Sequence, residues 1–352
     1  MKKLKLFLSF LIVVSFSLFM SCDHNDDPIQ PGPDVPPGPE PTPVTHVYVA
    51  GNTSYSFFSG PAVCWEDGIL NTLDANAYEA ARAVCVKGDD VYYGGSDADG
   101  HPVLWKNGTA QVLANDYGCV TDLTVANGKL YASGKVNDMP VYWVDGQMVS
   151  LDTDPNSYNG YTTTAIFVNG NDVYVSGFSG NEFNSGQGAY LWKNGTLQKL
   201  SNNASEACDV CVYNNVVYVV GSESYTSGGI QKSVMWVNGA IRDVQVTTNN
   251  GLSSKATAVT IVNGKPYVVL EGWIGSAYDG AYQGFAWHNE QVTRLYNCDR
   301  PKDVFVHNND IYIAGASGQY HNNPALLKNL SKVTLNSGGT YGYGNCFSVF
   351  VK

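Results

Sequence analysis

The stretch AYLWKNGTLQKL (residues 189–200) has a near copy upstream, PVLWKNGTAQVL (residues 102–113). Each copy places Asn-Gly between two runs rich in apolar, β-branched and aromatic residues. Asn-Gly in this setting is a strong hairpin signal, because a type I′ turn needs a positive φ at both central residues. The two copies therefore predict two similar β-hairpins.

The hairpin belongs to a unit that occurs seven times. A pattern similar to VYVxG opens each unit, and its tyrosines are 39 to 49 residues apart: Tyr48, Tyr92, Tyr131, Tyr174, Tyr218, Tyr267 and Tyr312. A second recurring position follows the VYVxG pattern in each unit. It is tryptophan in six units and leucine in the last: Trp65, Trp105, Trp143, Trp192, Trp236, Trp287 and Leu327. A fixed period of this length indicates a repeat architecture.

Each unit has the pattern of four strands. In the fourth unit, AIFVNGNDVYVSG (165–177) supplies two strands around a turn, and the hairpin at 189–200 supplies two more. Four strands in this length are typical of a propeller blade. The first unit begins at its second strand, HVYVAG (46–51), and the chain ends with a first strand, CFSVFVK (346–352). We therefore predict an all-β, seven-bladed propeller over residues 46–352, closed by the C-terminal strand joining the first blade.

The second strand of each unit resembles that of kelch repeats, although LWKNG departs from the kelch pattern of the third strand. The chain thus resembles bacterial surface lipoproteins with kelch-like or WD-like propeller repeats. The resemblance implies a fold and no particular activity.

The N-terminus has the pattern of an export signal. Three lysines precede an apolar run, and FMSC (19–22) resembles a lipobox, so we expect a signal peptide over residues 1–21 and lipidation of Cys22. An ordinary cleaved signal or an uncleaved anchor is the alternative. Residues 22–45 contain eight of the fifteen prolines and predict an extended linker. Its early aspartates favour the outer cell surface, although Asp23 after the cysteine is an inner-membrane retention signal in other bacteria.

The charge of the mature chain disfavours nucleic acid. Without the three leader lysines, 17 Lys and Arg face 31 Asp and Glu, a net charge of −14. The seven cysteines after Cys22 are an odd number, which argues against a disulfide-dependent fold. We expect a monomer that contacts the membrane through its lipid anchor only.

One face of the propeller is predicted to carry the function. The turns between first and second and between third and fourth strands are short, whereas the other connections are long and uneven. Variable loops on a rigid scaffold are where binding usually takes place. The linker enters at the short-turn face, so we expect the long-loop face to point away from the membrane.

Aromatic and basic residues of the long-loop face are the candidate ligand contacts. Trp273, Tyr278 and Tyr282 lie outside the repeat pattern and predict a stacking platform, or else a loop that packs on its own aromatic rings. The further candidates are Tyr158, Tyr161, Tyr225, Tyr320, Arg82 and Lys302.

Three aspartates recur at one position of the first strand in alternate blades: Asp122, Asp209 and Asp303. Alanine holds this position in the second, fourth and sixth blades. A ring of carboxylates would suit calcium; alternatively, each aspartate accepts backbone N–H groups in its own loop. No other cofactor is expected, and a short calcium-like sequence at Asp97 and Asp99 lacks the pattern of an EF-hand.

These observations favour a non-catalytic propeller that binds an extracellular ligand, with glycan as first choice. A scaffold for another envelope protein is the second interpretation. A polysaccharide-active glycosidase or lyase is the third, because the long loops also contain acidic residues.

Overall fold

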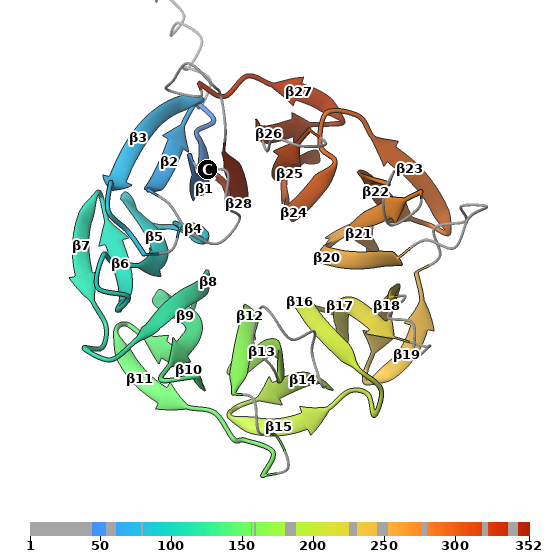
Figure 1. The fold of residues 1–352 in the computed structure, drawn as a ribbon, viewed down its shortest axis with the longest axis horizontal. Helices are drawn as coiled ribbons and strands as arrows, with labels where there is room; N and C mark the ends of the chain where they lie inside the picture. Colours follow the sequence, from blue (N-terminus) through green and yellow to red (C-terminus); the bar gives the residue numbers. More distant parts are fainter. Residues whose placement is uncertain are drawn as a thin grey trace, which may run out of the picture. The chain divides into compact units, whose positions relative to one another are not determined.

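The repeats form seven four-stranded antiparallel sheets arranged in a ring (Figure 1). The computed structural model describes residues 44–53, 61–78, 80–155, 157, 160–179, 188–224, 231–244, 253–275, 280–318, 323–336 and 344–352. Thr45–Lys352 forms one compact unit. The all-β, seven-bladed propeller predicted from the sequence is confirmed.

Within each blade the strands follow one another from the centre of the ring to its rim, and the innermost strands of neighbouring blades are in contact. From centre to rim, blade 1 consists of β28 (Asn345–Val351), β1 (Val47–Asn52), β2 (Ala62–Glu66) and β3 (Ile69–Asp74), and blade 2 of β4 (Ala83–Lys87), β5 (Asp90–Ser96), β6 (Pro102–Lys106) and β7 (Thr109–Val112). Blade 3 consists of β8 (Gly118–Ala126), β9 (Lys129–Val136), β10 (Met139–Val144) and β11 (Gln147–Ser150), blade 4 of β12 (Tyr161–Asn169), β13 (Asp172–Ser179), β14 (Gly188–Lys193) and β15 (Thr196–Lys199), and blade 5 of β16 (Ser205–Tyr213), β17 (Val216–Ser224), β18 (Gln231–Val237) and β19 (Ala240–Asp243). Blade 6 consists of β20 (Ser253–Val262), β21 (Lys265–Ile274), β22 (Ala281–His288) and β23 (Gln291–Leu295), and blade 7 of β24 (Arg300–His307), β25 (Asp310–Ser317), β26 (Asn323–Lys328) and β27 (Ser331–Val333).

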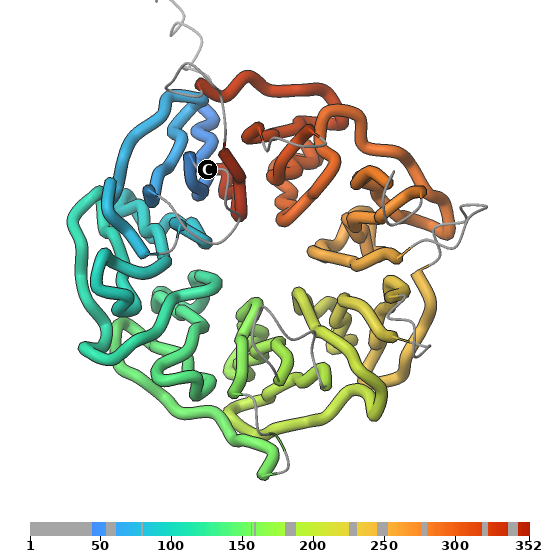
Figure 2. The backbone as a smooth tube through the Cα atoms, in the orientation of Figure 1, coloured from blue at the N-terminus to red at the C-terminus, as the bar shows by residue number. Residues whose placement is uncertain are grey.

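The two ends of the propeller close the ring. The C-terminal strand β28 pairs antiparallel with β1, from Val47 opposite Val351 to Asn52 opposite Asn345. Figure 2 shows the start and the end of the propeller chain lying side by side in blade 1. Backbone bonds between His46 and Lys352 continue this pairing beyond the strands. The predicted closure is confirmed, and it removes two sheet edges that would otherwise be open.

The repeat tryptophans fill the spaces inside and between blades. Trp65, Trp105, Trp143, Trp192 and Trp236 are among the largest fully buried side chains. The indole of Trp192 also donates to the Asp152 carbonyl at 2.7 Å, and Asp152 follows the last strand of blade 3. The tryptophans of blades 1 to 5 thus each place a large aromatic ring in the core of the propeller.

The Asn-Gly turns have the predicted geometry and a second role. In the blade 4 hairpin, Asn194 and Gly195 have φ values of 52° and 86°, as a type I′ turn requires. The Asn194 side chain then accepts the backbone N–H of Val173 at 2.8 Å, at the start of the second strand. The same residue therefore both turns the outer hairpin and ties it to the inner one.

Candidate ligand-binding site

A β-bulge occurs near the start of the innermost strand in six of the blades. In β8, for example, Val120 and Asp122 both pair with β9 while Thr121 is left out of the register. Bulges of this kind re-aim a side chain and are common beside binding sites. In blade 2, the corresponding residue directly precedes β4. The seven residues at this position, in blades 1 to 7, are Phe347, Arg82, Thr121, Thr164, Cys208, Thr257 and Lys302.

The glycine of the VYVxG pattern makes room for the bulge. A Cβ on Gly134 would lie 2.1 Å from the Cys119 carbonyl oxygen and 2.7 Å from the Trp143 ring. A Cβ on Gly221 would lie 1.8 Å from the Glu206 carbonyl oxygen. In these two blades only glycine fits beside the bulged inner strand. Blade 6 has Leu270 at the corresponding position and also contains the bulge, so glycine is not required for it in every blade.

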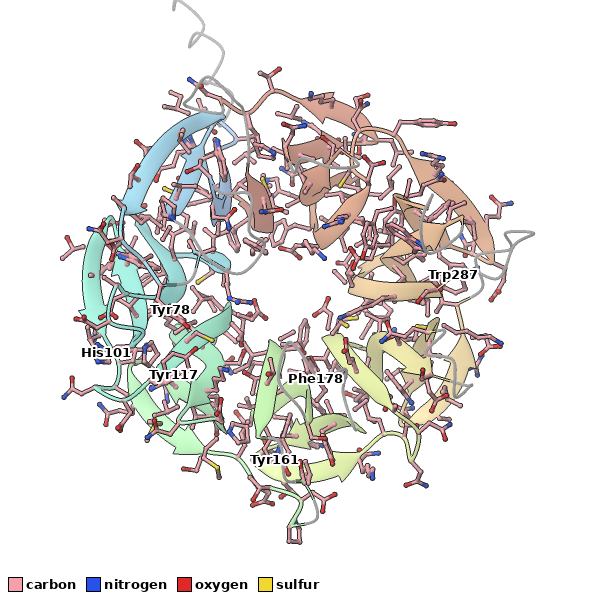
Figure 3. The ribbon with its side chains drawn as sticks, viewed as in Figure 1. Tyr78, His101, Tyr117, Tyr161, Phe178 and Trp287 are labelled. Carbon is pink, nitrogen blue, oxygen red and sulfur yellow. The ribbon has the colours of Figure 1, made fainter. Side chains whose placement is uncertain are left out.

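All seven bulge-position residues line one cavity of about 440 Å³. The cavity lies in the centre of the ring, at the end where the innermost strands begin and where the long connections join them. Phe178, from the end of β13, also points into this central space (Figure 3). We call this cavity the funnel. Its volume is within the range of small-ligand sites.

Blades 5, 6 and 7 give the funnel a charged wall. Lys302 forms an ion pair with Glu271 at 3.0 Å, and Lys255 forms one with Glu206; in both pairs the glutamate belongs to the preceding blade. Burial works to lower the pKa of Lys255, but Cys208 and the Glu206 and Glu271 carboxylates outweigh it and raise the pKa overall. Lys255 therefore keeps its positive charge in the funnel wall.

An arginine stacked on a tyrosine completes this wall. The guanidinium of Arg300 lies 3.7 Å from the centroid of the Tyr282 ring, and both side chains line the funnel. This distance is within the range of a cation–π contact. The edge of Trp273 packs on Tyr282, with ring centroids 4.9 Å apart. The Trp273, Tyr282 and Arg300 side chains thus form one stack that leads into the funnel.

Threonines form the opposite wall. Thr121 bonds to Ser133 and to Thr163 of the next blade at 3.1 and 3.0 Å. Thr164 donates to the Ala207 carbonyl, again in the next blade, at 3.0 Å. These hydroxyl groups connect blades 3, 4 and 5 and offer polar contacts at the funnel surface.

The structure brings three of the predicted ligand contacts together. Arg82, Lys302 and Tyr282 line the funnel, and Trp273 supports Tyr282. Trp273 and Tyr282 lie opposite each other on β21 and β22, so the expectation that they belong to a loop was wrong. Their strands are longer than the repeat pattern indicates.

Of the other predicted contacts, the structure describes only Tyr161, which is not among the residues that line the funnel. Tyr161 is buried, packs against Tyr190 and Trp192, and bonds through its hydroxyl to the backbone of Asp154. Its ring faces are covered, so it is not a stacking residue. The others fall outside the described residues: Cys22, Tyr158, Tyr225, Tyr278 and Tyr320.

The three recurring aspartates connect neighbouring blades. Asp122 accepts the N–H of Leu123 in its own strand and the N–H of Ile166 in the next blade, both at 2.8 Å. Asp209 does the same with Val210 and Val259, and Asp303 with Val304 and Val349. We call these three residues the aspartate clamps; they join blades 3 and 4, 5 and 6, and 7 and 1.

An odd number of blades prevents strict alternation of aspartate and alanine. Blade 1 has Ser348 at the clamp position, and its hydroxyl accepts the Val84 N–H of blade 2 at 3.4 Å. Among the described residues, the only close trio of potential metal ligands lies elsewhere, in blade 2. The clamp oxygens accept backbone N–H groups, and calcium at these residues stays a prediction.

The clamps predict an unusual pH dependence of stability. Burial raises the pKa of Asp122 to about 7, and burial also raises the pKa values of Asp209 and Asp303. The folded state then binds more protons than the unfolded state from about pH 4 to pH 7. The free energy of unfolding therefore falls as the pH rises through this window. The fall is at most about 1.4 kcal/mol per pH unit for each extra proton bound by the folded state. We expect a higher melting temperature at pH 5 than at pH 7.5, and a smaller difference in Asp122→Asn. A melting temperature that rises with pH across this window would contradict the assignment.

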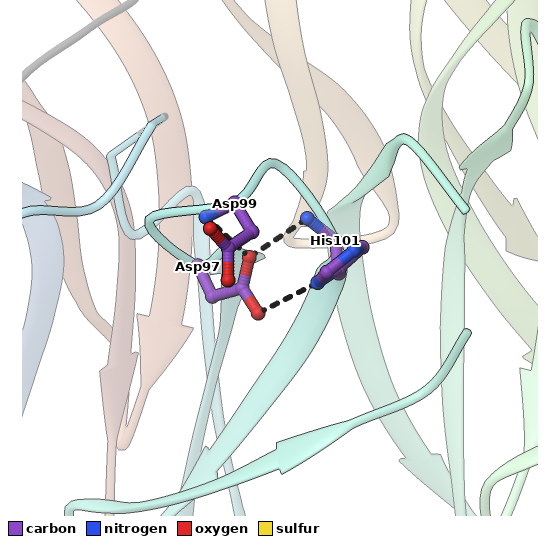
Figure 4. Close-up of side chains that lie close together, drawn as sticks. All are labelled: Asp97, Asp99 and His101. Carbon is purple, nitrogen blue, oxygen red and sulfur yellow. Dashed lines mark hydrogen bonds and ion pairs between the residues drawn. The ribbon is translucent and has the colours of Figure 1, made fainter. Parts of the chain in front are cut away.

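The close trio of potential metal ligands consists of Asp97, Asp99 and His101 (Figure 4). Asp97 accepts the backbone N–H groups of Asp99 and His101 at 3.0 and 2.8 Å, and its second oxygen contacts the His101 ring at 3.1 Å. Both carboxylate oxygens thus hold the turn between β5 and β6. Asp97 therefore has a structural role in this turn.

The funnel thiol is not arranged as a nucleophile. Burial raises the pKa of Cys208 to about 12, so the reactive thiolate is scarce near neutral pH. Every cysteine of the described residues is a free thiol. Cys208 and Cys211 do not act as a pair: Cys208 lines the funnel and Cys211 packs in a hydrophobic cluster.

Five of the bulge-position residues were missed in the sequence: Phe347, Thr121, Thr164, Cys208 and Thr257. A signal for them exists, because each directly precedes the clamp position in its blade. The pattern of aspartate and alanine could have marked this position in every repeat.

Comparisons with known proteins give only distant structural similarities. No family model and no curated protein matches the sequence. A protein from Lactobacillus plantarum has a TM-score of 0.49 and 13% identity, over 87% of this chain and 99% of that one. An endo-arabinase from Bacteroides thetaiotaomicron has a TM-score of 0.38 and 9% identity, over 62% and 94%. Domains 1–2 of Drosophila semaphorin 1a have a TM-score of 0.38 and 10% identity, over 72% and 74%.

TM-scores and identities this low do not indicate an activity. Within the described ranges, no helix has the length and apolar character needed to cross a bilayer.

Proposed function

We propose that this protein is a non-catalytic glycan-binding propeller whose binding site is the funnel. The observation that carries the proposal is the funnel lining. All seven blades contribute a side chain at the bulge position, and the cavity has the size of a small-ligand site. A sugar presents hydroxyl groups at its edges and an apolar C–H face, and the funnel offers threonines together with the rings of Tyr282, Phe178 and Phe347.

The carboxylates of the funnel favour binding over hydrolysis. A glycosidase uses two carboxyl groups in different roles, one of them as a proton donor. Glu271 and Glu206 are instead each engaged by a lysine, Lys302 and Lys255. The two glutamates therefore serve as partners that position the lysines.

We also propose a location for the protein in the cell envelope. Lipidation of Cys22 would anchor the chain to the outer membrane, with residues 22–45 as the linker. His46 lies beside the Asp67 turn, with its ring 2.8 Å from the Asp67 carboxylate, at the short-turn end of blade 1. The funnel opens at the end of the inner strands opposite to His46.

Truncation of Tyr282 tests the funnel as the site. We expect Tyr282→Ala to weaken glycan binding by roughly tenfold or more, because central aromatic residues dominate binding energy, and to leave the melting temperature of the free protein little changed. The measurement is a thermal-shift screen against a glycan panel, followed by titration calorimetry of the glycans that bind.

Tyr296→Ala is the matched control. Tyr296 is 70% exposed, lies outside the funnel lining, and also has an arginine over its ring, Arg294 at 5.5 Å. It should bind glycan like the unchanged protein. If no glycan raises the melting temperature, the ligand is instead an envelope protein; if glycans are cleaved to new reducing ends, the protein is an enzyme.

A further inference from the structure

We infer that the funnel selects an acidic sugar, a uronic acid at a chain end or as a short oligosaccharide. The inference rests on the proposed function and adds the chemical class of the ligand. It begins from the charge of the funnel lining. Among its described residues, four are basic and one is acidic: Arg82, Lys255, Arg300, Lys302 and Glu271.

This charge is opposite to that of the whole chain, which is −11 at pH 7. Adding Glu206, the ion-pair partner of Lys255, still leaves two more positive than negative groups among the described lining residues and this partner. A local excess of positive charge in a cavity favours anions.

Geometry favours a carboxylate as the anionic group. The Arg300 guanidinium carbon lies 3.7 Å from the centroid of the Tyr282 ring, and a guanidinium group can bind the two oxygens of a carboxylate at once. Lys302 lies on the same strand, β24, and also lines the funnel. The two side chains therefore act on the same region of a ligand.

The rest of the funnel suits the sugar ring of a uronic acid. Thr121 and Thr164 provide hydroxyl groups on the wall of blades 3 and 4. Phe178 and Phe347 provide apolar surface. A simple anion such as phosphate would use only the charged wall, whereas a uronic acid contacts both walls at once.

The direct test is titration calorimetry of the protein with trigalacturonate and with its neutral methyl ester. We expect the free acid to bind at least tenfold more tightly than the ester, and more tightly than inorganic phosphate. Arg300→Gln and Lys302→Gln should each remove most of this preference. Arg294→Gln, which alters an exposed arginine on a tyrosine outside the funnel, should keep it.

A variant that removes a negative charge from the funnel distinguishes a loss of ligand contacts from a folding defect. Glu271→Gln removes the one carboxylate in the described lining and should tighten trigalacturonate binding by several-fold, a gain that a misfolded protein would not show. Equal binding of acid and ester, with both weakened by Tyr282→Ala, would overturn the uronate inference while the glycan function stands. If neither acid nor ester nor any neutral glycan binds, the proposed function itself fails.

Discussion

A chain that ends at Gly344, and so lacks β28, is expected to lose cooperative folding. β28 is the innermost strand of blade 1, and Cys346, Val349 and Val351 pack with Trp65 in one buried cluster. Its loss would expose β1 along its full length and leave the Asp303 clamp without the Val349 N–H. Such an open ring has a newly free sheet edge at β1 and a broken core. Circular dichroism melting and size-exclusion chromatography would detect the loss.

A circular permutant is the matched control for this deletion. The His46 and Lys352 backbones are hydrogen-bonded to each other, so a short turn can join them. New ends placed between β27 and β28 would then leave every strand present. The permutant should melt in one transition close to that of the parent. A truncated chain that melts like the parent would show that the C-terminal strand is dispensable.

Loss of an aspartate clamp is expected to have the second-largest effect. Asp209→Ala would leave the Val210 and Val259 N–H groups without their acceptor, and both residues are buried. An unpaired buried N–H costs about 1–3 kcal/mol, so the free energy of unfolding should fall by about 2–5 kcal/mol. Urea denaturation gives this value directly.

Ser348→Ala is the comparison for the stability loss expected in Asp209→Ala. Ser348 occupies the same position in blade 1 and accepts one N–H, at 3.4 Å. Its loss should cost about 1 kcal/mol or less. If Asp209→Ala were as mild as Ser348→Ala, the clamps would not be holding the blades together.

The fold was predictable because the repeat encodes it locally and seven times over. Asn194-Gly195 determines a hairpin within four residues, and Trp192 marks the strand before it. Closure also followed from the pattern, since a first strand was missing at one end and present at the other. None of these inferences needed the position of a distant residue.

The site was only partly predictable, because side-chain direction at a bulge depends on pairing across the sheet. In a regular strand Thr121 and Asp122 would point to opposite faces. The bulge sends Thr121 into the funnel and places Asp122 against the next blade, through contacts 44 residues away along the chain. The same limit explains Tyr161, whose burial results from packing on Tyr190 and Trp192.

We expect the funnel to bind a glycan through its charged and threonine walls. A crystal structure of the protein with trigalacturonate bound is the decisive experiment. It should show sugar density in the funnel, with a carboxylate within hydrogen-bond distance of Arg300 and Lys302 and a ring face against Phe178 or Phe347. An empty funnel with the sugar bound at another surface would contradict it.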